Sequence, residues 1–198
     1  MKKRLLLALV VLMGIFLLSA STVWADAPAP VEKTGQTTCY NTSGTEISCT
    51  DTGQDGDLQK GVTSPSPRFT DNGDGTVTDN LTGLMWAKNA NLGGLMTWDD
   101  AIDYANSLSL GSDGCGSPYT DWRLPNRFEL ESLLDLGNIG PVLPSNHLFL
   151  NALSTNYWSS TTYIGVTSSA WDVSMYNGYV KHNYKTNVYY VWPVRGGN

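Results

Sequence analysis

The apolar residues between positions 97 and 108 recur with the period of a helix. They are Trp98, Ala101, Ile102, Ala105 and Leu108. Spacings of three and four place them on one side of an amphipathic helix. Thr97 and Asp100 approximate a capping box at its start, with Asp in place of the more usual Glu or Gln.

A second helix is predicted directly after Asn126, because Asn126 and Glu129 have the spacing of a helix cap. Pro125 stands just before this cap, where its ring does not interrupt the helical hydrogen bonds. The predicted apolar side of this helix consists of Phe128, Leu130, Leu133 and Leu134.

Short strands are predicted on either side of these helices. Residues 68–79 have the pattern of a hairpin with its turn at Asp74 and Gly75. A second turn at 79–83 leads into a third strand at 84–86. We therefore expect a three-stranded meander, in which the acidic residues serve mainly as turn formers.

Four further strands are predicted near the C-terminus, at residues 157–163, 170–176, 179–184 and 188–194. Asn177 and Gly178 mark a tight turn between the second and the third of them. Pro193 indicates that the last strand lies at an edge of the sheet or ends there. With the two helices, these strands predict an α+β fold in which the helices pack on antiparallel β-sheet.

Residues 1–25 have the pattern of an export signal. Three basic residues precede the apolar run 5–18, and small residues precede a predicted cleavage before Asp26. An uncleaved membrane anchor is the alternative, but the apolar run is shorter than the roughly 20 residues that span a bilayer. We expect a periplasmic or secreted protein, without stable membrane insertion after signal cleavage.

Residues 26–66 are rich in Gly, Ser, Thr, Asp and Pro, which predicts a leader without a packed core before a single domain at 67–198. In an oxidising compartment, Cys39 and Cys49 are expected to form a disulfide across a turn-rich segment. A zinc site would need further ligands nearby. Cys115 is then the odd thiol, and we expect it to be at least partly buried.

Signal removal changes the charge balance of the chain. It takes three of the 12 basic residues and none of the 18 acidic ones, which leaves a net charge of −9. Such a chain repels polyanions at long range, so nucleic acids and anionic lipids are not expected as partners. A local basic patch is compatible with this balance.

Six segments carry distinctive motifs in a fixed order: 71–86, Thr97 and Trp98 with Ala101, 119–134, 157–161, 170–178 and 190–197. Together they resemble the C-terminal domain of the Legionella collagen-like adhesins. The resemblance implies a C-type-lectin-like fold, shared with the sulfatase-modifying enzymes, and adhesion to sulfated glycosaminoglycans. Unlike those adhesins, the chain has no Gly-X-Y repeat and hence no collagen stalk to drive trimerisation. Its oligomeric state stays open.

Catalysis finds little support in the sequence. The sulfatase-modifying enzymes depend on a cysteine pair late in the fold, whereas this chain has no Cys after Cys115. His147 and His182 offer no 2-His-1-carboxylate arrangement, and Ser159 and Ser160 lie in no nucleophile elbow. We expect no catalytic residues, no metal site and no cofactor. The alternative is a periplasmic enzyme or enzyme accessory on the sulfatase-modifying scaffold.

Calcium stays open, but the sequence does not support a known site. Calcium-dependent lectins combine a Glu-Pro-Asn or Gln-Pro-Asp loop with a Trp-Asn-Asp strand. Here residues 124–126 lack the carboxylate and residues 171–173 lack the second acid, so the oxygen ligands are incomplete. The aspartates of 52–57 do not have EF-hand spacing, which favours a solvated loop.

A binding role is predicted from the aromatic residues of the late strands. They are Tyr163, Trp171, Tyr176, Tyr179, Tyr184, Tyr189, Tyr190 and Trp192. Aromatic faces stack on sugar rings and anchor protein interfaces, and the basic residues nearby suit an anionic ligand. The predicted ligand-binding residues are Tyr176, Tyr179, Lys181, His182, Tyr184 and Lys185.

Other motif residues are predicted to be structural: Trp122, Arg123, Pro125, Asn126, Trp158, Trp171 and Arg195. The tryptophans expected in the core are Trp86, Trp98, Trp122, Trp158 and Trp171. Arg123, Arg127 and Arg195 are expected in ion pairs or carbonyl contacts. The sequence thus predicts an exported, non-catalytic binding module for recognition or adhesion, with a glycan, glycosaminoglycan or surface protein as partner.

Overall fold

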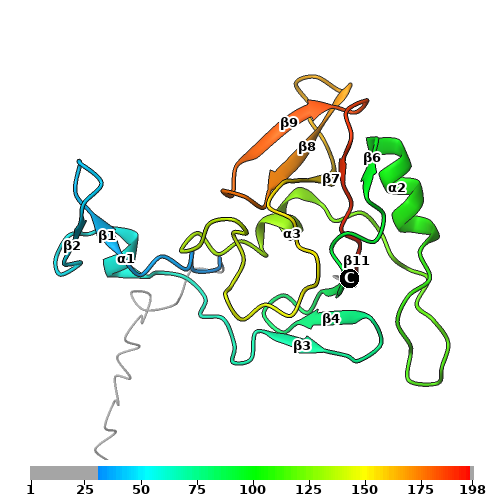
Figure 1. The fold of residues 1–198 in the computed structure, drawn as a ribbon, viewed down its shortest axis with the longest axis horizontal. Coiled ribbons are helices and arrows are strands. Elements are labelled where there is room, and N and C mark those ends of the chain that lie inside the picture. Colours follow the sequence, from blue (N-terminus) through cyan, green and yellow to red (C-terminus); the bar gives the residue numbers. More distant parts are fainter. Residues whose placement is uncertain (1–30, 197–198) are drawn as a thin grey trace, which may run out of the picture.

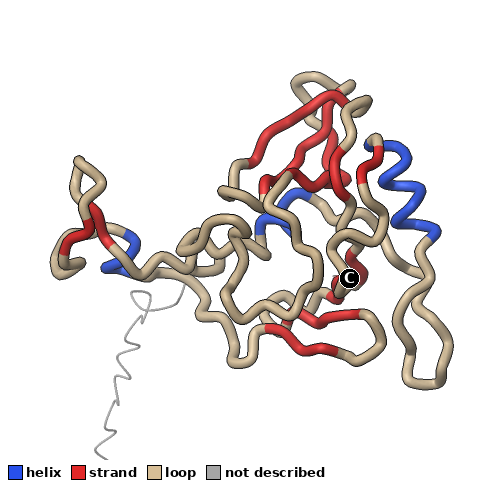
Figure 2. Tube along the Cα trace, viewed as in Figure 1, coloured by secondary structure: helices blue, strands red, loops and turns tan. Residues whose placement is uncertain are grey.

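The computed structural model describes residues 31–196. The predicted export signal and the cleavage before Asp26 lie outside the described residues. Within the described part, no helix is long and apolar enough to cross a membrane. The architecture of the described residues is mixed α+β, with a two-stranded, a four-stranded and a five-stranded sheet and short helices joined by long loops (Figure 2).

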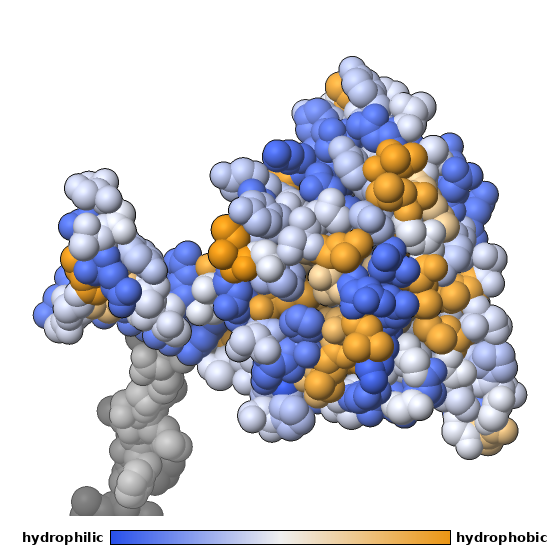
Figure 3. Space-filling model, in the orientation of Figure 1, coloured by the Kyte–Doolittle hydropathy of each residue, from blue (hydrophilic) through white to orange (hydrophobic). Residues whose placement is uncertain are grey.

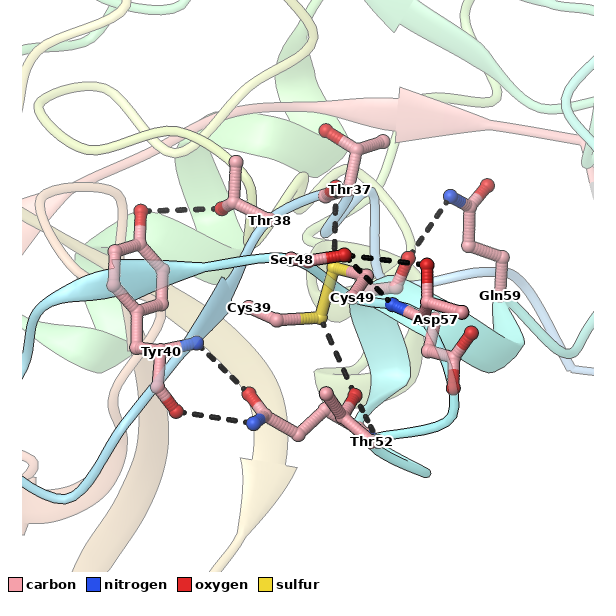
Figure 4. Close-up of a disulfide and its surroundings, with 12 residues drawn as sticks. Thr37, Thr38, Cys39, Tyr40, Ser48, Cys49, Thr52, Asp57 and Gln59 are labelled. Carbon is pink, nitrogen blue, oxygen red and sulfur yellow. Dashed lines mark hydrogen bonds between the residues drawn. A yellow bond between two sulfur atoms is a disulfide. The ribbon is translucent and has the colours of Figure 1, made fainter.

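The leader forms a small hairpin that projects from the main body (Figure 1). It consists of β1 (Cys39–Tyr40), β2 (Glu46–Ile47) and the short helix α1 (Asp55–Leu58). The predicted disulfide is confirmed, since Cys39 and Cys49 are bonded with their Cα atoms 5.2 Å apart. The amide of Gln54 holds Tyr40 through two hydrogen bonds of 3.0 Å, one to its N–H and one to its C=O. Figure 4 shows that the disulfide joins the hairpin to the segment before α1.

The predicted meander is confirmed and is part of a four-stranded sheet, in the order β11-β5-β4-β3. Its strands are β3 (Phe69–Asp71), β4 (Thr76–Asp79), β5 (Met85–Ala87) and β11 (Val194–Arg195). In the first turn, Asp74 accepts a 3.0 Å hydrogen bond from the Thr76 N–H, and Gly75 takes a left-handed φ of 89°, which suits glycine. The closing strand β11 pairs with β5 and joins the two ends of the domain.

The second sheet has five strands, in the order β6-β10-β7-β8-β9. They are β6 (Leu95–Met96), β7 (Asn156–Thr162), β8 (Ser169–Ser174), β9 (Val180–Tyr184) and β10 (Tyr189–Tyr190). The prediction of a purely antiparallel sheet is wrong at one ladder, because β10 pairs with β7 in parallel. The last predicted strand is divided into β10 and β11, since the chain leaves one sheet and enters the other around Pro193.

Both predicted helices are present, as α2 (Trp98–Ser107) and α3 (Arg127–Glu131). Asn126 and Glu129 form a complete capping box at the start of α3. Phe128 does not face the core as predicted, because its side chain is 75% exposed. In a helix of only five residues, Phe128 lies about 200° around the axis from the buried Leu130 and therefore points outward.

Two clusters of buried side chains form the interior. The larger one centres on Trp86 and Trp192, whose rings meet edge to face at 5.7 Å. The smaller one lies between α2 and the five-stranded sheet around Trp158. Trp122 is also buried, whereas Trp98 and Trp171 are only partly buried. Cys115 is exposed and unpaired, contrary to the expectation of burial, because it lies in a solvated loop.

Candidate functional site

Arg123 links three segments of the domain through hydrogen bonds. The Arg123 guanidinium donates hydrogen bonds of 2.7 and 2.6 Å to the two carboxylate oxygens of Glu129 and one of 2.9 Å to the Gly196 C=O. The hydrogen bonds from Arg123 to Glu129 raise the arginine pKa. Glu129 also accepts the Asn126 N–H of the capping box at 2.7 Å. This network fastens the start of α3 to the last residues of the domain.

Two further motif residues also contact the scaffold. Arg195 donates to Asp121 at 2.7 and 3.1 Å and lies 3.7 Å from the ring centre of Tyr119. The hydrogen bond from Arg195 holds the pKa of Asp121 below its usual value. Trp158 donates its indole N–H to the Met96 C=O at 3.1 Å. Arg195 and Trp158 thus contact other parts of the scaffold.

The turn between β8 and β9 presents exposed aromatic side chains. Tyr176 and Tyr179 are 51% and 60% exposed. The loop around Leu136 and Ile139 lies beside this turn, since the Gly140 N–H donates to the Tyr176 C=O at 2.9 Å. Leu136 and Ile139 are themselves exposed. We call these four residues the tip patch.

Lys181 lies next to the tip patch, with its ammonium 5.4 Å from the ring centre of Tyr179. Lys185 follows on the same side of the strand. Its ammonium lies 3.8 Å from the ring centre of Trp98 and donates to the Thr162 hydroxyl at 3.0 Å. Lys185 thus contacts neighbouring side chains, while Lys181 remains exposed.

The opposite side of β9 carries His182 and Tyr184, because alternate residues of a strand face opposite sides. His182 stacks on Tyr163 with 3.9 Å between ring centres, and Trp171 meets both rings edge on. The guanidinium of Arg127 also lies over Trp171, with its central carbon 4.4 Å from the centre of the ring. The six predicted ligand-binding residues therefore lie at the tip and on two faces of the sheet.

The pairing of His182 with Trp171 could have been derived from the sequence. The turn at Asn177 and Gly178 fixes the register of β8 and β9, in which Trp171 is opposite His182. No local pattern in the sequence predicts that Arg127 lies over Trp171, because Arg127 belongs to α3, which is far from β8 in the sequence.

The central carboxylate of the five-stranded sheet is Asp172, which is fully buried. It accepts hydrogen bonds from the Asn156 and Asn183 amides at 2.6 and 2.7 Å. Burial raises its pKa, although these hydrogen bonds oppose the shift. Asp172 thus links three strands.

Among residues 31–196 there is no cluster of three or more His, Cys, Asp or Glu that could hold a metal ion.

A concave region lies where the leader meets the main body. A cavity of about 350 Å³ is lined there by Glu32, Lys33, Arg68 and Asp135, among others. Arg68 is buried and forms ion pairs with Glu32 and with Asp79. The sequence did not reveal this contact, since the leader has no apolar periodicity and is held by polar groups.

These observations define a mixed α+β domain with a motif-rich scaffold and an exposed aromatic hairpin. Residues 75–195 match the family model of the Lcl C-terminal domain, and the chain belongs to this family. The family resemblance read from the sequence is thereby confirmed. No curated protein matches the chain.

Proposed function

We propose that this protein is an exported, non-catalytic module for recognition or adhesion, and that it binds a glycan through the tip patch and Lys181. Its domain adopts a C-type-lectin-like fold and acts in the periplasm or outside the cell. The observation that carries the proposal is the exposure of Tyr176 and Tyr179 beside the exposed ammonium of Lys181. The Cys39–Cys49 disulfide supports an oxidising compartment.

The chemistry of the tip suits a sugar ligand. Tyrosine rings stack on the apolar faces of sugars, and their hydroxyls add directional hydrogen bonds. No Asp or Glu follows Asp172 in the sequence, so Lys181 attracts sulfate or carboxylate groups in an otherwise acidic protein. Binding of this kind needs neither calcium nor another cofactor.

A glycan and glycosaminoglycan array, probed at two salt concentrations, tests this function. We expect binding by the wild-type chain and a loss of about tenfold or more for the triple variant Tyr176→Ala, Tyr179→Ala and Lys181→Ala. Salt should weaken the Lys181 contribution and spare stacking. The melting temperature should remain within a few degrees, because all three side chains are exposed.

Tyr40→Ala provides a matched control, since Tyr40 is also exposed but lies on the leader hairpin. This variant should bind like the wild type. An array without any bound glycan, or equal binding by the triple variant, would contradict the proposal. Measurable turnover that is lost on chelation would favour the enzyme alternative instead.

A further inference from the structure

β9 forms one edge of the five-stranded sheet. On its inner side it pairs with β8. A backbone hydrogen bond is present at each end of this ladder. The Ser174 N–H donates to the Tyr179 C=O at 2.8 Å, and the Lys185 N–H donates to the Ser168 C=O at 2.9 Å. In an antiparallel ladder, hydrogen-bonded and non-bonded pairs alternate. The inward groups are therefore those of residues 179, 181, 183 and 185.

The backbone groups of Val180, His182 and Tyr184 consequently point away from the sheet. The Tyr184 C=O accepts the Asn187 N–H at 2.8 Å. The outward edge thus offers three N–H donors and two C=O acceptors at the spacing of a strand. In the part of the chain that the structure describes, no segment pairs with β9 on this side, as Figure 1 shows for its outer position.

The other sheet edges are shorter. β6 and β11 have two residues each and β3 has three, whereas β9 has five and pairs with β8 without a register shift. Proteins protect long edges with prolines, bulges or charged side chains, because unpaired strand groups recruit another strand. β9 contains no proline and no bulge, and its one charged side chain, Lys181, disfavours a cationic partner strand but not an acidic one.

A cavity of about 150 Å³ lies directly at this edge. It is lined by Val166, Ser169, His182, Asn183 and Tyr184. His182 and Tyr184 form part of its wall, and the exposed Val166 adds an apolar surface. In strand addition, backbone hydrogen bonds provide affinity and such side-chain pockets provide specificity. The space suits one apolar side chain of the added strand.

Charge indicates the character of the added strand. Lys181 and His182 are exposed at the edge, and no acidic residue occurs between Val173 and the C-terminus. A second copy of β9 would bring two such cationic strands together. An acidic strand instead complements them, with acidic side chains on the Lys181 side and apolar ones toward the cavity.

We propose that the edge of β9 binds an extended acidic peptide segment of a partner protein as a sixth strand of the sheet. The periodic arrangement of donors and acceptors favours a peptide over a glycan, which lacks a matching backbone. This site uses the strand edge and its cavity rather than the tip patch. It shares Lys181 with the glycan proposal but uses neither Tyr176 nor Tyr179, so it can hold where that proposal fails.

A nine-residue peptide that alternates glutamate and valine provides the probe. Binding of the labelled peptide to the purified exported chain is measured by fluorescence anisotropy, beside a lysine–valine peptide of the same length. His182→Pro removes an outward N–H and leaves the ladder to β8 intact, which edge strands tolerate. We expect it to weaken binding about tenfold. The matched variant His182→Ala keeps the N–H and should bind within about threefold of the wild type.

Amide hydrogen exchange gives a second readout on the wild-type chain and does not depend on the folding of a variant. The peptide should slow exchange at Val180, His182 and Tyr184, while Lys181 and Asn183 are protected already. Equal binding of both peptides, unchanged exchange at the three outward amides, or equal affinity of His182→Pro and His182→Ala would overturn the proposal. So would binding of a sulfated oligosaccharide at this edge in place of the peptide. The double variant Tyr176→Ala and Tyr179→Ala, which keeps Lys181, should bind the peptide like the wild type, which separates this test from the glycan test.

Discussion

At the scale of single residues, aromatic side chains of similar chemistry have opposite roles. Trp192 is fully buried, where it contacts Trp86, Phe149 and Tyr157 and donates its indole N–H to the Ala87 C=O at 2.9 Å. Phe128 is largely exposed beside Arg127. The composition of the motifs does not distinguish these roles, and only the burial of each ring does.

This contrast predicts the effect of truncating each ring. Trp192→Ala should lower the free energy of unfolding by about 3–5 kcal/mol, because it leaves a cavity in the larger core cluster and removes a buried hydrogen bond. Phe128→Ala should change it by no more than about 0.5–1 kcal/mol. Urea denaturation of the two variants checks this. Similar losses for both would mean that the assignment of core and surface is wrong.

At the scale of elements, the leader hairpin is held by its disulfide and by few contacts with the main body. Cys39 and Cys49 are separated by 10 positions, and closing a loop of this size contributes about 2–3 kcal/mol to the element that it closes. Removing the bond should therefore affect the hairpin and spare the two core clusters.

The double variant Cys39→Ser and Cys49→Ser should unfold the hairpin locally and leave the melting temperature of the main body within a few degrees. Limited proteolysis should then cut between residues 37 and 53 in the double variant and not in the wild type. Cys115→Ser is the control and should resemble the wild type. Loss of the main transition in the double variant would contradict this independence.

Elements were predictable from the sequence where local rules decide them. The spacing of Asn126 and Glu129 predicted α3, and Asn177 with Gly178 predicted the turn before β9. The parallel ladder of β10 with β7 was not predictable, because a single residue pair carries it. The candidate ligand-binding residues were predictable only as a list, since the alternation along β9 divides them between two faces.

At the scale of the whole molecule, the leader is attached to the main body by polar contacts. Figure 3 shows apolar residues in several patches on the main body, separated by hydrophilic ones. The leader contacts one side of this body before the hairpin projects (Figure 1). Its contacts are backbone bonds, such as Leu136 N–H to the Thr34 C=O at 2.6 Å, and the buried ion pair of Glu32 with Arg68. The attachment of the leader therefore depends on the charge of Glu32.

Burial raises the pKa of Glu32 to about 7, and the nearby Asp79 acts in the same direction, although Arg68 opposes the shift. In the unfolded chain Glu32 titrates near its ordinary value of 4.5. Between pH 4.5 and 7 the folded protein therefore binds more protons at Glu32 than the unfolded chain. This residue makes the protein more stable as the pH falls through that window, by at most about 3 kcal/mol.

Other groups titrate in or near the same range, so the test compares variants. Burial lowers the pKa of His147, which makes the protein less stable as the pH falls below the ordinary value of 6.5. The difference between the wild type and Glu32→Gln isolates Glu32, because His147 is common to both. As the pH falls from 7.5 to 5, the free energy of unfolding of the wild type should increase by about 1–3 kcal/mol relative to that of Glu32→Gln.

Asp71→Asn is the matched control in the same measurement. Hydrogen bonds from Lys88 and the Gly73 N–H lower the pKa of Asp71, so its contribution is lost only as the pH falls below the ordinary value of 3.8. Between pH 5 and 7.5 the difference in free energy of unfolding between the wild type and Asp71→Asn should stay constant.

Parallel pH profiles for the wild type and Glu32→Gln would show that Glu32 is ionised throughout. The leader would then be held by a permanent ion pair with Arg68, and its attachment would be the same in neutral and in acidic surroundings.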